Sequence, residues 1–114
     1  MTSTRDYPSV ELIAAVGTWS DAFIATRDSA FEGGLSLPIE TQEDITSLPG
    51  WTDYQLADSS RVSVPEWSGT VEIDGHTFRC EVISTGRRCL LGRQVLDELE
   101  ICFRFGREVR IRFE

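Results

Sequence analysis

The strongest constraint on the fold is a hairpin pattern in the second half of the chain. Apolar residues alternate with polar ones on both sides of Asp74-Gly75, at Val71, Ile73, Phe78, Cys80 and Val82. Asp-Gly is a preferred pair for a two-residue turn that joins antiparallel strands. Alternation with a period of two buries one face of each strand and leaves the other in water. The pattern therefore predicts an antiparallel hairpin with one buried face.

Further strands are predicted along most of the chain. Apolar and β-branched runs predict strands over 10–16, 22–25, 35–37 and 89–92. The residues between the first two, 17–21, break the pattern and predict a turn. A polar turn flanked by two strand edges is predicted within 56–64. No repeat or linker divides the chain, so we expect one mostly β domain.

Two short helices are predicted, over 38–48 and 93–99. Pro38 suits the first turn of a helix, and Pro49-Gly50 ends it. The second helix has inward positions at Val95, Leu96 and Leu99. After it, apolar and charged residues alternate on both sides of Gly106-Arg107. This predicts a closing antiparallel hairpin with apolar positions at Ile101, Phe103, Phe105, Val109, Ile111 and Phe113.

Composition narrows the class of function. The chain has 114 residues, 40% of them hydrophobic, so it is long enough for one domain with a modest core. The formal net charge of -8 argues against nucleic-acid binding, which needs a basic face. No apolar run is long enough to cross a membrane, and the first residues lack the apolar core of a signal peptide. We therefore expect a cytoplasmic protein without a membrane or nucleic-acid partner, in which the polar residues 1–8 are flexible and 9–114 form the domain.

The cysteines argue against a metal site. Cys80, Cys89 and Cys102 are odd in number, contain no C-x-x-C spacing, and have only His76 as a further soft ligand. Reduced and mostly buried thiols are the simpler interpretation. We predict no metal and no cofactor.

A candidate acid lies at Asp28. It follows a β-type run, precedes the small-residue turn 29–34, and is followed by the strand 35–37 and Pro38. This layout presents a carboxylate on a loop at the end of a strand, where catalytic groups are often placed. An Asp-Ser pair in a turn also commonly does no more than bond to its own backbone. The stretch by itself leaves both interpretations open.

Five motifs in order resemble the retropepsin-like (clan AA) aspartic proteases, of a small prokaryotic type. Asp28-Ser29-Ala30-Phe31 followed by Gly34-Leu35-Ser36-Leu37-Pro38 resembles the active-site loop and the strand after it. The other motifs are the flap-like 56–60, the central hairpin 71–82, the apolar-apolar-Gly element Leu90-Leu91-Gly92, and the helix with its closing hairpin. The resemblance runs from about residue 9 to residue 113. It implies a retropepsin-like closed β-barrel half, the acid protease fold, with one domain per chain.

The resemblance also assigns roles. Asp28 would be the catalytic acid, the hydroxyl of Ser29 would tie two active-site loops together, and Ala30 would offer backbone to the substrate. Leu90, Leu91 and Gly92 would pack under the loop. The flap that closes over the substrate would consist of Ala57, Asp58, Ser59, Ser60 and Arg61.

Two positions depart from the family pattern. Ala30 stands where the family has glycine, and Ser59 stands where the flap turn usually has glycine. Glycine allows close approach of a ligand and positive φ, whereas a Cβ restricts both. Neither departure removes the acid, but both bear on whether the chain is active.

One acid in a short chain implies two chains. Peptide hydrolysis by this route needs one carboxylate that takes a proton from water and one that donates a proton to the peptide. The chain has a single active-site loop, so a symmetric homodimer would bring two copies of Asp28 together. The predicted function is a homodimeric aspartic endopeptidase that acts on a peptide or protein substrate.

Other functions stay open. Ala30 and Ser59 motivate the alternative of a catalytically weak or inactive protease-like dimer that binds peptides or merely dimerises. An acidic interaction subunit with the same small β fold is a third possibility. A serine hydrolase is disfavoured because no G-x-S-x-G elbow accompanies His76. The tryptophans, at positions 19, 51 and 67, are better explained by packing than by ligand stacking.

Overall fold

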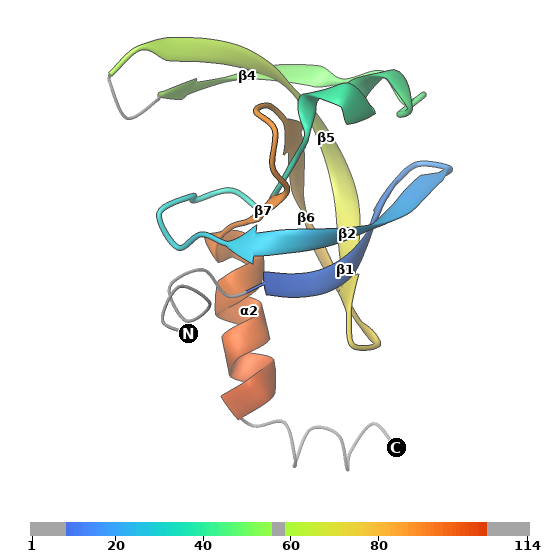
Figure 1. Ribbon diagram of the computed structural model, residues 1–114, viewed down its shortest axis with the longest axis vertical. Coiled ribbons are helices and arrows are strands. Elements are labelled where there is room, and N and C mark those ends of the chain that lie inside the picture. The colour runs from blue at the N-terminus through green and yellow to red at the C-terminus, as the bar shows by residue number, and fades with distance from the viewer. Residues whose placement is uncertain (1–8, 56–58, 105–114) are drawn as a thin grey trace.

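The computed structural model describes residues 9–55 and 59–104, with the backbone alone for 100–104. Figure 1 shows a strand-rich body with one α-helix along its lower side. The strands are β1 (Ser9–Val16), β2 (Trp19–Arg27), β3 (Leu35–Leu37), β4 (Gly50–Gln55), β5 (Arg61–Ile73), β6 (His76–Ser84) and β7 (Leu90–Leu91). A 3₁₀ helix, η1 (Ile39–Glu43), follows β3, and the helix α2 (Arg93–Arg104) follows β7.

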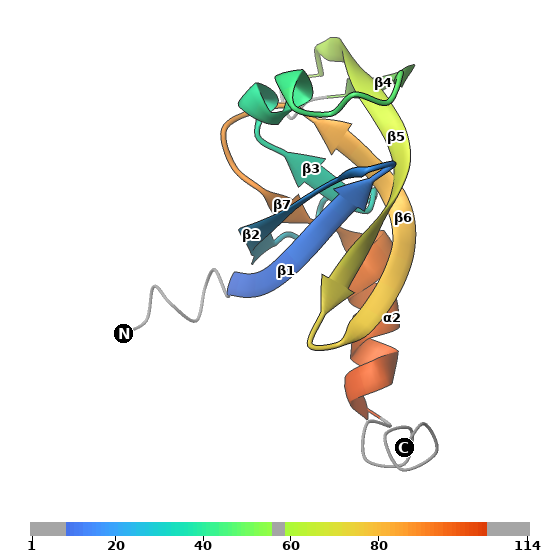
Figure 2. The same cartoon turned by 90° about the vertical axis from the view of Figure 1, so that its right-hand side faces the viewer.

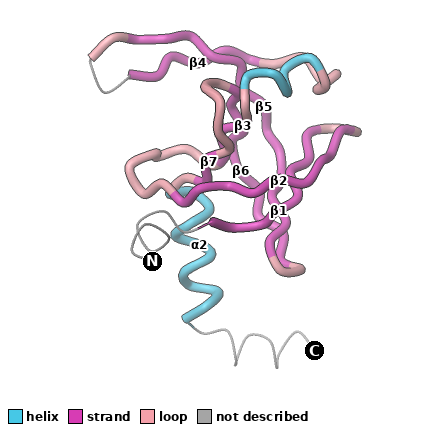
Figure 3. The backbone as a smooth tube through the Cα atoms, viewed as in Figure 1, coloured by secondary structure: helices cyan, strands magenta, loops and turns pink. Residues whose placement is uncertain are grey.

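Six of the strands close into a barrel. The order β1-β2-β7-β3-β6-β5 returns to its start because β5 also pairs with β1, at Ile13–Ala15. The β2–β7 and β3–β6 pairs are parallel and the others are antiparallel. β4 pairs only with the outer half of β5, so the β4–β5 hairpin extends beyond the barrel, as Figures 2 and 3 show. The predicted mostly β barrel fold is confirmed.

The hairpin expected at Asp74-Gly75 is confirmed. β5 and β6 pair from Glu66↔Ile83 to Ile73↔His76, which leaves Asp74 and Gly75 as a two-residue turn. Their φ values of 54° and 83° are both positive, as a type I′ turn requires. Val71 and Val82 are fully buried on the inner face. Local turn chemistry and alternation thus agree with the fold.

The core fills the barrel and continues under α2. Alternate residues of β1 and the inward side of β3 are buried, and Val95 and Leu99 of α2 complete the cluster. Val95 and Leu99 are four residues apart and therefore lie on one face of the helix. That face packs on the barrel near β6.

Several element bounds differ from the sequence-based expectations. The first turn is only Gly17-Thr18, since β2 already pairs with Val16 at Trp19. β5 is one strand of 13 residues that runs through Pro65, and β4 was not predicted. The helix expected over 38–48 is limited to η1, and Leu48 is 94% exposed. Ile45 is buried in the core, but Ile39 is 54% exposed, so the apolar positions do not form one continuous buried face that would support a longer helix.

The prediction that residues 101–104 form the first strand of a closing hairpin is wrong. Residues 101–104 belong to α2, which continues to Arg104. The alternation at Ile101 and Phe103 competes with a helical spacing that runs on from Val95 and Leu99, and the helix prevails. The second strand, at 109–113, lies outside the described residues, as do residues 1–8.

Candidate active site

The candidate acid lies on a tight turn directly after β2. The backbone N–H of Asp28 donates to the Leu91 carbonyl oxygen at 2.9 Å, which continues the β2–β7 pairing by one residue. Its Oδ1 accepts the N–H of Ala30 at 3.1 Å, and its carbonyl oxygen accepts the N–H of Phe31 at 3.1 Å. Asp28 is half-buried, while Ser29 and Ala30 are exposed. The turn therefore holds the carboxylate at the barrel surface.

The loop after Asp28 rests on β7 and on the start of α2. Leu91 is fully buried, and the N–H of Gly92 donates to the Gly34 carbonyl oxygen at 2.8 Å. Arg93 and Gln94 donate their N–H groups to the carbonyl oxygens of Phe31 at 2.8 Å and Gly33 at 3.1 Å. N–H groups in the first turn of a helix have no partner within the helix, and the loop carbonyls supply one. The loop and the helix thus brace each other.

A cleft of ≈ 540 Å³ opens beside Asp28. The loop side consists of Asp28, Ala30, Phe31 and Glu32. The opposite side belongs to the β4–β5 hairpin and consists of Tyr54, Gln55, Val62 and Val64. Strand residues between them complete the lining, among them Ser36, Ile83 and Leu90. The half-exposed acid therefore shares one concave space with a projecting hairpin.

Three of the candidate flap residues, Ser59 to Arg61, are described, and they lead into β5 of this hairpin. Ala57 and Asp58 lie outside the described residues. Ser59 lies in a bend with a φ of 73°, Ser60 follows it, and Arg61 begins β5 opposite Gln55. A positive φ is unstrained for glycine and unfavourable for serine. Ser59 therefore has a backbone conformation that favours glycine, the residue that the family pattern has at this position.

Negative charge gathers at one end of the cleft. Burial raises the pKa of the Tyr54 phenol, and the carboxylates of Glu81, Glu66 and Glu32 raise that pKa further. Burial and then Glu81 likewise raise the pKa of Glu66. The Tyr54 ring lies 6.1 Å from the Phe31 ring, tilted by 53°, so the acidic end includes a contact between β4 and the loop.

The structure brings together some predicted site residues and adds others. Asp28 and Ala30 line the cleft with Leu90, whereas Ser29 is exposed outside that lining. Leu91 and Gly92 lie behind the loop. Sequence reasoning missed Glu32 and Tyr54. The β-type residues of 51–54 were the available signal, but their distance in sequence from Asp28 hid the contact.

Other site types find little support in the described part of the chain. Within residues 9–55 and 59–104, no three His, Cys, Asp or Glu side chains cluster as metal ligands would. Cys80 and Cys89 are unpaired, and the pKa of each is raised to about 12, chiefly by burial. No helix in those residues has the length and apolarity needed to cross a membrane.

Comparison with known proteins supports the fold. The chain matches no family model and none of the curated proteins. Among 162 matching chains of solved structures is the EIAV protease complexed with the inhibitor HBY-793. The two are 12% identical with a TM-score of 0.64, over 82% of this chain and 88% of that retroviral protease. At this identity the likeness establishes the architecture alone, which is the retropepsin-like acid protease fold.

Proposed function

We propose that the chain is one half of a homodimeric aspartic endopeptidase. The observation that carries the proposal is the position of Asp28, half-buried on a braced turn and lining a cleft beneath a projecting hairpin. The cleft presents this one aspartate together with apolar and polar side chains that suit an extended peptide. A two-fold axis beside the loop would pair Asp28 with its copy in a second chain.

The pair of carboxylates would act as one acid and one base. Two close carboxylates resist joint ionisation and therefore share a proton. The ionised Asp28 takes a proton from a water molecule, whose oxygen attacks the carbonyl carbon of the peptide. The protonated Asp28 of the other chain donates its proton to the peptide, which allows the C–N bond to break and the amine to leave. Peptide cleavage then requires that the two Asp28 carboxylates share exactly one proton, so the pH–rate profile is bell-shaped with an acidic optimum.

The decisive experiment compares two aspartate variants. Asp28→Asn keeps the shape of the side chain but cannot exchange the proton. We expect peptide cleavage, measured on a broad peptide library between pH 3 and pH 7, to fall by at least about 10³-fold. Asp21→Asn is the matched control, since Asp21 is an exposed aspartate on β2 outside the cleft lining. It should cleave at the wild-type rate.

Sedimentation must accompany the assay. Both variants should sediment as dimers with wild-type stability, so that lost turnover reports chemistry rather than unfolding. Undiminished cleavage by Asp28→Asn would move the chemistry to other residues. A wild-type protein that stays monomeric at micromolar concentration would refute the paired mechanism.

A second function is favoured by Ala30. Its side chain is exposed and lines the cleft where the family pattern has glycine, so a Cβ occupies space beside a bound peptide. This observation favours a dimer that binds peptides without cleaving them. Such a protein would bind library peptides without turnover, and Ala30→Gly would then be the variant that tests whether crowding at this position prevents cleavage.

A further inference from the structure

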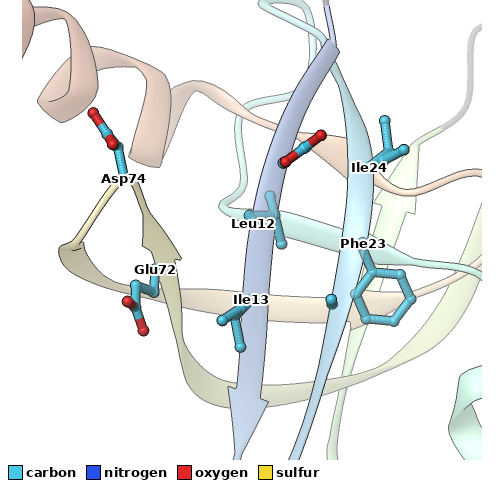
Figure 4. A pocket seen from close by; sticks show the side chains of 8 residues that line it. Leu12, Ile13, Phe23, Ile24, Glu72 and Asp74 are labelled. Carbon is cyan, nitrogen blue, oxygen red and sulfur yellow. The ribbon is translucent and has the colours of Figure 1, made fainter.

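A second groove lies on the outer face of the barrel, away from the cleft. It measures ≈ 650 Å³ and is formed by β1, β2 and the end of β5. Figure 4 shows Glu72 and Asp74 on one side of Ile13, with Phe23 and Ile24 on the other. None of its lining residues also lines the cleft beside Asp28. The groove is therefore independent of the proposed catalytic function.

The groove combines an apolar floor with an acidic border. Ile24 is 69% exposed and Ile13 is 44% exposed, and both point outward between paired strands. Glu11, Glu72 and Asp74 supply three carboxylates around them. An apolar surface of this kind in water is unfavourable unless something covers it. Its charge selects an occupant that is apolar and basic.

The chain contains one segment with that chemistry. Residues 107–113 hold three of the eleven basic residues and a single acid, which gives this segment a net charge of +2. The formal net charge of the whole chain is -8, so the other residues together carry -10. Within the segment, Val109 and Ile111 alternate with Arg110 and Arg112, and Phe113 continues the apolar series. The hairpin partner expected for this pattern, at 101–104, is helical instead.

The groove is within reach of that segment. α2 ends at Arg104, and ten residues follow it. Arg107 and Phe113 are three and nine residues beyond Arg104, so an extended chain places them up to about 10 Å and about 30 Å from the end of the helix. Figures 1 and 2 both place the second half of α2 and the β5–β6 turn, which contains Asp74, at the same end of the molecule. The end of α2, from which the segment continues, therefore lies at the same end of the molecule as the acidic border of the groove.

We propose that the groove formed by β1, β2 and the end of β5 is the docking site for residues 107–113 of the same chain. In an extended segment, Val109, Ile111 and Phe113 share one face and cover Ile13 and Ile24. The arginine stems fold along the border so that their guanidinium groups reach the carboxylates of Glu11 and Glu72. Docking in cis is favoured over docking on a second copy, because the linkage gives a high effective concentration.

Amide hydrogen exchange on the full chain tests the proposal. In the wild type, the amides of 107–113 should exchange at least about tenfold more slowly than in Ile24→Ser, which removes the apolar floor. Leu48→Ser is the matched control, since it replaces an aliphatic side chain of the same size by serine at a 94% exposed position in the segment between η1 and β4. It should leave the protection of 107–113 at its wild-type value.

A second experiment exchanges the charges of the segment and of the groove. Arg110→Glu with Arg112→Glu should remove the protection, and adding Glu11→Arg with Glu72→Arg should restore it. Protection that rises with protein concentration would mean docking on a second copy and would overturn the cis proposal. Absence of protection in the wild type, or protection that survives Ile24→Ser, would overturn it as well.

Discussion

At Gly92 the backbone passes so close to the active-site loop that a side chain has no room. A Cβ on Gly92 would meet the Gly33 carbonyl oxygen, and it would lie 2.6 Å from Phe31 Cδ2 and 2.8 Å from the Phe31 carbonyl oxygen. Two of these neighbours are backbone atoms of the loop, which the N–H groups of Arg93 and Gln94 hold in place. Close approach, rather than an unusual dihedral, requires glycine here.

Gly92→Ala should therefore destabilise the protein. Overpacking of a rigid site costs about 1–3 kcal/mol, and more where backbone must move. Gly50→Ala is the matched control, because its new Cβ would meet only the Glu66 carbonyl oxygen at 3.8 Å, an ordinary contact. Urea unfolding of both variants measures the effect. Equal midpoints for Gly92→Ala and the wild type would show that the loop does not rest on this glycine.

At the scale of elements, the β4–β5 hairpin is linked to the Asp28 loop through aromatic rings. Phe31 comes from the loop and Tyr54 from β4, and both line the cleft. β4 pairs only with β5, so its position relative to the loop depends on the twist of β5 and on contacts of this kind. The pair couples the hairpin to the loop that bears the candidate acid.

A double-mutant cycle measures that coupling. Phe31→Leu and Tyr54→Leu, alone and together, should give a coupling free energy of about 0.5–1.5 kcal/mol from thermal or urea unfolding. Trp51→Leu replaces Tyr54→Leu in the control cycle, since Trp51 is an aromatic residue of the same strand that is 65% exposed. That cycle should be additive. Equal coupling in the two cycles would argue against a specific Phe31–Tyr54 contact.

At the scale of the whole molecule, a buried thiol, Cys89, and a partly buried one, Cys80, make the free energy of unfolding depend on pH in the alkaline range. The pKa of Cys89 is raised from 9.0 to about 12 by burial. The pKa of Cys80 is raised to the same extent by burial, then by the charges of Glu98 and Glu81. The unfolded chain loses these protons near pH 9, while the folded chain keeps them until about pH 12. The stabilisation is therefore complete below pH 9 and is lost as the pH rises toward 12.

The free energy of unfolding should fall by about 1.4 kcal/mol per pH unit for each thiol in that window. Cys89→Ala should halve the part of the slope that arises from these two cysteines, whatever the variant does to stability at neutral pH. Denaturant unfolding at several pH values between 8 and 12 provides the measurement. Parallel curves for the variant and the wild type above pH 9 would mean that Cys89 ionises freely in the fold.

Local chemistry made several parts of this molecule predictable. The Asp74-Gly75 turn dictates a hairpin because its residues tolerate positive φ, and the alternation around it decides which face is buried. Asp28 was found as a candidate because a small-residue turn after a β-type run presents a side chain at a strand end. These features depend on neighbours in the sequence.

The tertiary structure decided what depends on distant partners. β1 closes the barrel on β5 through residues about 57 positions apart, and the cleft brings Asp28 together with residues of five strands, β3 to β7. α2 continues through 101–104 although the sequence there also alternates like a strand. A short segment whose apolar residues fit both the two-residue period of a strand and the 3.6-residue period of a helix takes the form that its long-range packing favours. Here Val95 and Leu99, earlier in the same helix, already pack on the barrel. The sequence alone specified where the chain turns and which face of each strand is buried, because these follow from the dihedral preferences of single residues and from the period of the apolar residues. Which faces meet, and so where a site forms, was set by burial that only the closed barrel provides.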